Sequence, residues 1–109
     1  MGKGDHLGEF EHLVMLALLR LKDAAYGMRV RREIQSRTER SVAIGSVYAT
    51  LDRLEHKGYV LASAGREEGG RARKYFRLTP HGAQALLRKQ DAIQRMTEGV
   101  SVRQELEAM

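Results

Sequence analysis

The segment Ile44–Val60, with the sequence IGSVYATLDRLEHKGYV, gives the strongest indication of the fold that we predict for this chain. Val47, Leu51 and Leu54 lie at i, i+4 and i+7, which predicts a helix with one face in a core. The helix should end just before Gly58, because glycine supplies the left-handed conformation that commonly terminates helices. The remaining face is small, polar and cationic, and we expect it to present Ser46, Ala49, Thr50 and Arg53.

A basic hairpin follows this helix. Residues 59–64 and 74–78 alternate imperfectly between apolar and polar side chains, which predicts two short strands. The loop Arg66–Arg73, REEGGRAR, contains a Gly-Gly pair and is rich in arginine. A flexible cationic tip reaches phosphates or a narrow minor groove, and a small helix face fits a major groove about 12 Å wide. Solvated surface explains either feature alone, but a helix followed at once by a basic ribbon is the layout of a winged helix, a DNA-binding fold.

Length and composition restrict the class of protein. The chain has 109 residues, no cysteine and a formal net charge of +5, which predicts one compact domain with a polyanionic partner. The absence of cysteine excludes a disulfide framework and fits the reducing cytoplasm. The longest apolar run, Leu13–Leu19, is much shorter than the roughly 20 residues that span a bilayer. We therefore expect a soluble, cytoplasmic protein without a membrane segment.

Two further helices are predicted before Ile44. From Leu7 to Leu21 apolar residues recur at helical spacing on two faces. This helix either lies at the centre of its own core or packs one face against a partner subunit. A second helix, from Met28 to about Thr38, follows the turn at Tyr26-Gly27 and has a strongly basic outer face.

Thr79-Pro80 predicts the start of a last helix, because threonine caps helices and proline is favoured at the first helical position. Leu86, Ile93 and Val100 are each seven residues apart and form a single apolar stripe. We expect one long helix that packs against a second subunit; the alternative is that it folds back onto the first helix of its own chain. The predicted dimer interface consists of Phe10, Val14, Leu18, Leu86, Ile93, Met96 and Val100.

Four motifs occur in a characteristic order: Tyr26-Gly27, Gly45-x-x-Tyr48-x-x-Leu51-x-x-Leu54, Gly58, and Tyr75-x-x-Leu78-Thr79-x-x-Gly82. In this order they resemble the PadR family of bacterial transcriptional regulators, and the resemblance covers most of the chain. It implies a mostly α fold with a small two-stranded wing. The winged helix-turn-helix would occupy residues 7–79, and a C-terminal dimerisation helix residues 80–109.

The resemblance also implies roles for individual residues. The tyrosine at the position of Tyr48 and the basic residues of the wing would touch the DNA backbone, whereas Ser46 and Thr50 would lie near base edges. The full set of predicted DNA-binding residues is Ser46, Tyr48, Ala49, Thr50, Arg53, Arg66, Arg71, Arg73 and Lys74. Tyr48 has a second interpretation, as a half-buried core residue with its hydroxyl satisfied locally.

One position departs from the family pattern. Ala43 stands where many members have a residue able to cap the recognition helix. Loss of such a cap typically costs about 1 kcal/mol. We therefore expect Ser41 or a bound phosphate to take part of that role.

Together these observations predict a sequence-specific DNA-binding transcriptional regulator, a repressor that acts as a homodimer on an inverted-repeat operator in double-stranded DNA. The alternative is a winged-helix protein-interaction module without sequence-specific DNA binding. We predict no enzyme, metal or cofactor, because the histidines lack ligand spacing and Asp52 and Glu55 have basic neighbours at ion-pair spacing. A small apolar effector is a further candidate partner, lined by Met15 and Met96, although methionines at helical spacing more often belong to a core.

Overall fold

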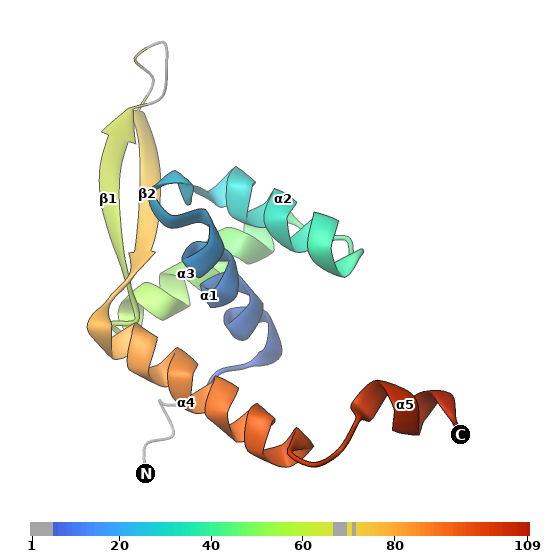
Figure 1. Cartoon of the computed structure of the whole chain (residues 1–109). Helices are drawn as coiled ribbons and strands as arrows, with labels where there is room; N and C mark the ends of the chain where they lie inside the picture. The colour runs from blue at the N-terminus through green and yellow to red at the C-terminus, as the bar shows by residue number, and fades with distance from the viewer. Residues whose placement is uncertain (1–5, 67–69, 71) are drawn as a thin grey trace.

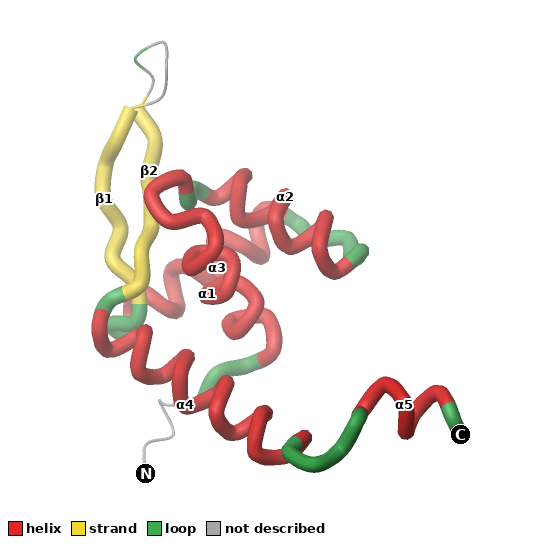
Figure 2. The backbone as a smooth tube through the Cα atoms, viewed as in Figure 1, coloured by secondary structure: helices red, strands yellow, loops and turns green. Residues whose placement is uncertain are grey.

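The computed structural model describes residues 6–66, 70 and 72–109. Helices surround one central helix, and a long two-stranded ribbon projects from the body (Figure 1, Figure 2). In chain order the elements are α1 (Glu9–Leu21), the 3-10 turn η2 (Lys22–Ala24), α2 (Gly27–Thr38), α3 (Ile44–His56), β1 (Val60–Arg66), β2 (Ala72–Leu78), α4 (Pro80–Thr97) and α5 (Val102–Glu107). This order confirms the predicted winged helix with a C-terminal extension.

The core forms around α1, which packs against α2, α3 and β2 (Figure 1). Val14 and Met15 are completely buried, and Leu18 is only 3% exposed. The predicted inner face of α3, formed by Val47, Leu51 and Leu54, is also completely buried. Burial of apolar side chains is the main driving force of folding, so α1 is the central core helix that one of the two interpretations expected.

Three residues predicted for the dimer interface belong to this core instead. Val14, Leu18 and Leu86 are at most 5% exposed within the single chain. A side chain that is covered by its own domain has no surface left for a second subunit. Their predicted place in the interface is therefore wrong, and Met15, which is buried beside them, is not available to line an effector pocket either.

Thr79 fixes the start of α4 and joins it to the end of α3. Its Oγ1 accepts a hydrogen bond from the Gly82 N–H at 2.9 Å and donates one to the Gly58 carbonyl at 2.6 Å. Gly58 has φ +77°, the left-handed conformation predicted for the residue that follows α3. Gly82 packs against the backbone of Tyr59, where an added Cβ would lie only 2.8 Å from the carbonyl carbon. The hydrogen bonds of Thr79 and the packing of Gly82 on Tyr59 hold α4 against the base of the ribbon.

The ribbon is longer than predicted. β1 and β2 are antiparallel, and their register runs from Val60 opposite Leu78 to Arg66 opposite Ala72. The sequence predicted strands only over 59–64 and 74–78, since apolar alternation ends there. Backbone pairing continues through the basic residues because strand hydrogen bonds involve main-chain groups, whatever the side chains. The ribbon therefore carries basic side chains on ordered backbone.

The C-terminal region forms two helices rather than one. α4 ends at Thr97, and Gly99 with φ +76° separates it from the short α5. The middle of α4 is tied to the N-terminal part of the chain, since Lys89 Nζ donates to the Leu7 carbonyl at 3.1 Å and His12 Nε2 of α1 lies 2.8 Å from Gln90 Oε1. The end of α4 and α5 extend away from the body (Figure 1). Along the described part of the chain no helix combines the length and the apolar character needed to cross a membrane.

Candidate nucleic-acid interface

The exposed face of α3 differs from the prediction at one residue. Ser46, Ala49 and Arg53 are exposed as expected, but Thr50 is only 1% exposed. Thr50 lies three residues after Val47, and residues at that spacing share a helix face. Its hydroxyl accepts a hydrogen bond from Arg53 Nη2 at 3.0 Å. The predicted base contact of Thr50 is therefore wrong, because the residue supports Arg53 from the buried side.

Glu11 was missed in the sequence analysis. Its carboxylate is largely buried on α1 and accepts hydrogen bonds from the Gly8 N–H at 2.9 Å and from Lys57 Nζ at 3.0 Å. Arg53 Nε lies 3.8 Å from the same carboxylate. Burial alone would raise the pKa of Glu11, but these hydrogen bonds and positive charges outweigh it and lower the pKa below its ordinary value. Glu11 thereby connects α1 to two basic side chains at the end of α3.

A hollow of about 390 Å³ lies beside the N-terminal half of α3, lined among others by Phe10, Arg40, Ser46 and Arg53. Arg40 lies over the Phe10 ring, 5.8 Å from its centroid. Phe10, a predicted dimer residue, is thus half-buried next to the exposed face of α3.

The start of α3 also carries no side-chain cap, since Ala43 holds the cap position. The Ser46 N–H donates instead to the Ala43 carbonyl at 3.1 Å. Among the described residues the Ser41 side chain makes no hydrogen bond to the start of α3, so the predicted capping by Ser41 is wrong, while the alternative of a bound phosphate stays a prediction.

Tyr48 links α3 to the beginning of α2. Its side chain is 45% exposed, and its ring lies against Gly27, where an added Cβ would be 2.5 Å from the Tyr48 Oη. The Tyr48 ring therefore packs on the body of the protein, while much of the side chain faces solvent. Close packing of the Tyr48 ring explains why a glycine follows Tyr26, and the sequence alone does not reveal this contact.

The basic residues of the wing lie on both faces of the ribbon. Arg73 and Lys74 are neighbours on β2, and successive strand residues point to opposite faces. The Arg73 guanidinium stacks on Tyr26 at 3.7 Å from the ring centroid, whereas Lys74 Nζ lies 5.7 Å from the Phe76 ring on the other face. Arg66 is exposed and donates to the Gly70 carbonyl at 2.7 Å. Arg71 lies outside the described residues.

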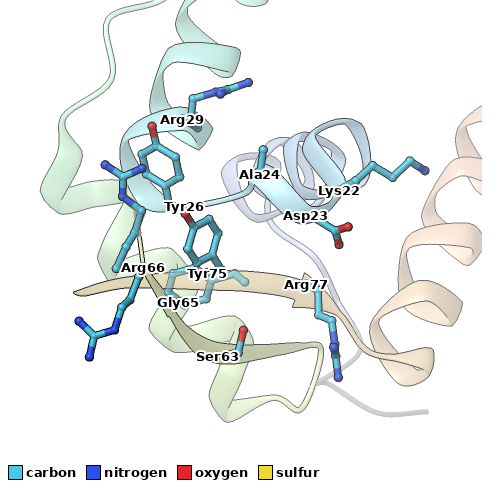
Figure 3. Close-up of a pocket in the computed structure, with 12 residues that line it drawn as sticks. Lys22, Asp23, Ala24, Tyr26, Arg29, Ser63, Gly65, Arg66, Tyr75 and Arg77 are labelled. Atoms are coloured by element: carbon cyan, nitrogen blue, oxygen red, sulfur yellow. The ribbon is translucent and has the colours of Figure 1, made fainter. Parts of the chain in front are cut away.

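The outer face of the ribbon forms a groove with η2 and the start of α2 (Figure 3). This tyrosine groove has a volume of about 970 Å³ and is open to solvent. Tyr26 and Tyr75 lie in its middle, with Arg29 and Arg66 toward one end and Lys22, Asp23 and Arg77 toward the other (Figure 3). Its lining is completed by Ala24, Ser63, Gly65, Arg73 and Phe76. Sequence periodicity gave no sign of this groove, because its walls come from separate parts of the chain.

The remaining predicted dimer residues are on the C-terminal extension. Ile93 and Val100 are 45% and 49% exposed, and Met96 is 80% exposed. Leu87 and Leu106 add further exposed apolar side chains on the same extension. Within the described ranges, no three histidine, aspartate or glutamate side chains gather as ligands for a metal ion.

Comparison with known proteins agrees with this architecture. The model of the transcriptional regulator PadR-like family matches residues 15–88. A PadR family transcription regulator from Clostridium difficile has 27% identity and a TM-score of 0.65, covering 81% of this chain and 94% of that one. A PadR-like transcription factor from Bacteroides fragilis has 24% identity and a TM-score of 0.71, covering 82% of this chain and 84% of that one. At 24% identity the second likeness concerns the fold alone.

A sequence relative is also known from Lysinibacillus sphaericus, an uncharacterised protein with 38% identity over 71 residues. The match covers 63% of this chain and spans only 64% of that relative's length. The family model covers more than half of the chain, and it includes α2, α3, the ribbon and the beginning of α4. The chain therefore belongs to the PadR-like family of transcriptional regulators, which are not enzymes.

Proposed function

We propose that this protein is a repressor that binds an inverted-repeat operator as a homodimer. One observation carries the proposal: a continuous surface joins the exposed face of α3 to the wing. Tyr48 of α3 packs on Gly27, and the adjacent Tyr26 lies under the Arg73 guanidinium of β2. A rigid duplex that contacts α3 in its major groove is thus within reach of the wing along one path.

The contacts divide into two kinds. Ser46, Ala49 and Arg53 are exposed on α3, where side chains meet base edges and carry sequence information. Tyr48 of α3 and Arg66, Arg73 and Lys74 of the ribbon are suited to phosphates, which position a protein without reading sequence. Arg71 belongs to the second kind by its place in the sequence.

The dimer rests on the C-terminal extension. Ile93 and Met96 of α4 and Val100 just after it are exposed and apolar, and this end of the chain leaves the body of the protein (Figure 1). Covering these side chains with the same surface of a second copy removes them from water. The two copies of α3 would then be related by a two-fold axis, with half-sites about 34 Å apart or a multiple of it. A small apolar effector would have to act on this same extension, since Met15 is buried.

The test is selection of bound sequences from a random duplex pool, followed by titration of the winner and an unrelated duplex at two salt concentrations. We expect an inverted repeat that binds at least a thousandfold more tightly than the unrelated duplex. In vitro transcription from a promoter containing that repeat should fall as protein is added. Salt-sensitive binding without a preferred sequence would contradict the proposal. Complete absence of binding would favour the protein-interaction module instead.

A further inference from the structure

The tyrosine groove is lined by more cationic than acidic side chains among the described residues. Five cationic side chains line it, and Asp23 is the only acidic lining residue among those described. Lys22, Arg29 and Arg77 form no ion pair with any acidic side chain of the described chain. Like charges that share a groove repel one another, and an anionic partner removes that repulsion. The five cations are Lys22, Arg29, Arg66, Arg73 and Arg77.

The floor of the groove is preorganised. The Tyr26 and Tyr75 rings meet edge to face, with centroids 5.7 Å apart and planes at 78°. Tyr75 covers Gly65, where an added Cβ would lie 2.7 Å from its Cε1 atom. Arg73 stacks on Tyr26 at 3.7 Å, a geometry that holds a guanidinium by cation–π attraction. Arg73 is therefore held on a packed aromatic floor and not on a loop.

The position and the open shape of the groove favour an extended ligand over a small molecule. The end of the groove at Arg29 is two residues along α2 from Gly27, against which Tyr48 of α3 packs. The groove is open and has a volume of about 970 Å³, whereas sites for small ligands enclose most of the ligand surface. A polyanion that passes α3 enters this groove without a break in the surface.

We propose that the tyrosine groove binds the sugar-phosphate backbone of the same duplex that α3 contacts. Arg29 holds the phosphates nearest α3, and Lys22 and Arg77 hold those farthest from it. The inference rests on the proposed function and extends the interface from α3 and the wing tip to the outer face of the ribbon. These contacts carry no base specificity, so they strengthen binding to every sequence equally.

The experiment compares full-length Arg77→Ala and Lys22→Ala with Arg88→Ala, an exposed arginine of α4 outside the groove. Each variant is titrated with the selected repeat and with an unrelated duplex between 50 and 200 mM salt, and its thermal unfolding is recorded. Each lost phosphate contact should lower the slope of log affinity against log salt by about 0.9. Over this salt range that slope corresponds to roughly a threefold change in affinity, equal for both duplexes. Arg77→Lys should restore the slope, since charge is what the phosphate requires.

Phosphate ethylation interference supplies a second measurement. The wild-type protein should show interference at phosphates beyond those opposite α3, and Arg77→Ala should lose it at the outermost positions. If Arg77→Ala and Lys22→Ala bind with the wild-type slope, as Arg88→Ala should, the groove proposal is overturned while the proposed function stands. If the wild-type protein binds no duplex at all, both fail together.

Discussion

The ring of Tyr48 lies directly against the backbone of Gly27, so that α3 and the first turn of α2 meet without an intervening side chain. An added Cβ at Gly27 would be 2.6 Å from the Tyr48 Cε1 atom, which real Cβ atoms essentially never approach. The glycine of the Tyr26-Gly27 motif is thus explained by close packing. The contact with Gly27 also sets the direction in which the partly exposed Tyr48 side chain points from α3.

Gly27→Ala should displace the Tyr48 ring and destabilise the protein by about 1–3 kcal/mol, the usual cost of overpacking. The same change in a Tyr48→Ala background should cost much less, because the clashing ring is gone. Chemical denaturation of the four proteins of this double-mutant cycle measures the difference. Equal costs in both backgrounds would show that the ring and the glycine are not coupled.

Glu11 should stabilise the protein in a pH-dependent way. Its pKa is lowered in the folded state by Gly8, Lys57 and Arg53 despite burial. A carboxyl with a depressed folded pKa contributes stability above its unfolded pKa and loses it as pH falls through the folded value. Glu11→Gln should therefore cost about 1–2 kcal/mol near pH 7, and the difference from wild type should shrink below the ordinary value of 4.5.

The matched control is Glu9→Gln, on the same helix. The Glu9 side chain is 80% exposed, and its contact with Arg40 is 3.7 Å long. Exposed ion pairs contribute little, so this variant should unfold like the wild type at every pH. Denaturation of the three proteins between pH 3 and 7 compares them. A pH-independent loss in Glu11→Gln would contradict the ionic role of Glu11.

Ser46 and Arg73 should separate base reading from backbone contact. Ser46→Val should change the preferred sequence of the half-site, with about 1–3 kcal/mol of discrimination at the affected base pair. Arg73→Gln should weaken binding to all duplexes by a similar factor and lower the salt slope. Repeating the pool selection with each variant measures both effects. An altered motif in Arg73→Gln, with an unchanged motif in Ser46→Val, would reverse the assignment.

Ile93→Asp and Met96→Asp should disrupt the proposed dimer. Both side chains are exposed in the single chain, so an aspartate there leaves the core intact but places a charge in the interface. Analytical ultracentrifugation should show a monomer, and affinity for the inverted repeat should fall. Arg95→Asp adds the same acid to another exposed position of α4 and should leave the dimer unchanged. A wild-type protein that sediments as a monomer would count against the homodimer from the outset.

The burial of Thr50 could have been predicted from its spacing on the helix. Thr50 lies at i+3 from Val47 and i−4 from Leu54, so helical geometry already places it on the buried face. Its polarity suggested exposure, but a hydroxyl is tolerated inside when it has a partner, here Arg53. For Val14, Leu18 and Leu86 the periodicity correctly predicts an apolar face that is buried. Periodicity marks an apolar face without saying whether that face is covered by the same chain or by another.

The secondary-structure elements of this protein can be predicted from its residues alone: the apolar face of α3, the glycine after it, the Thr79-Pro80 start of α4 and the basic ribbon. These signals are local, since helix period, strand alternation and caps depend on residues a few positions apart. Three contacts are visible only in the folded chain: Glu11 meets Lys57, 46 residues away, Tyr48 rests on Gly27, and Tyr26 and Tyr75 share a groove. Such contacts depend on proximity after folding, and spacing along the chain carries no record of them.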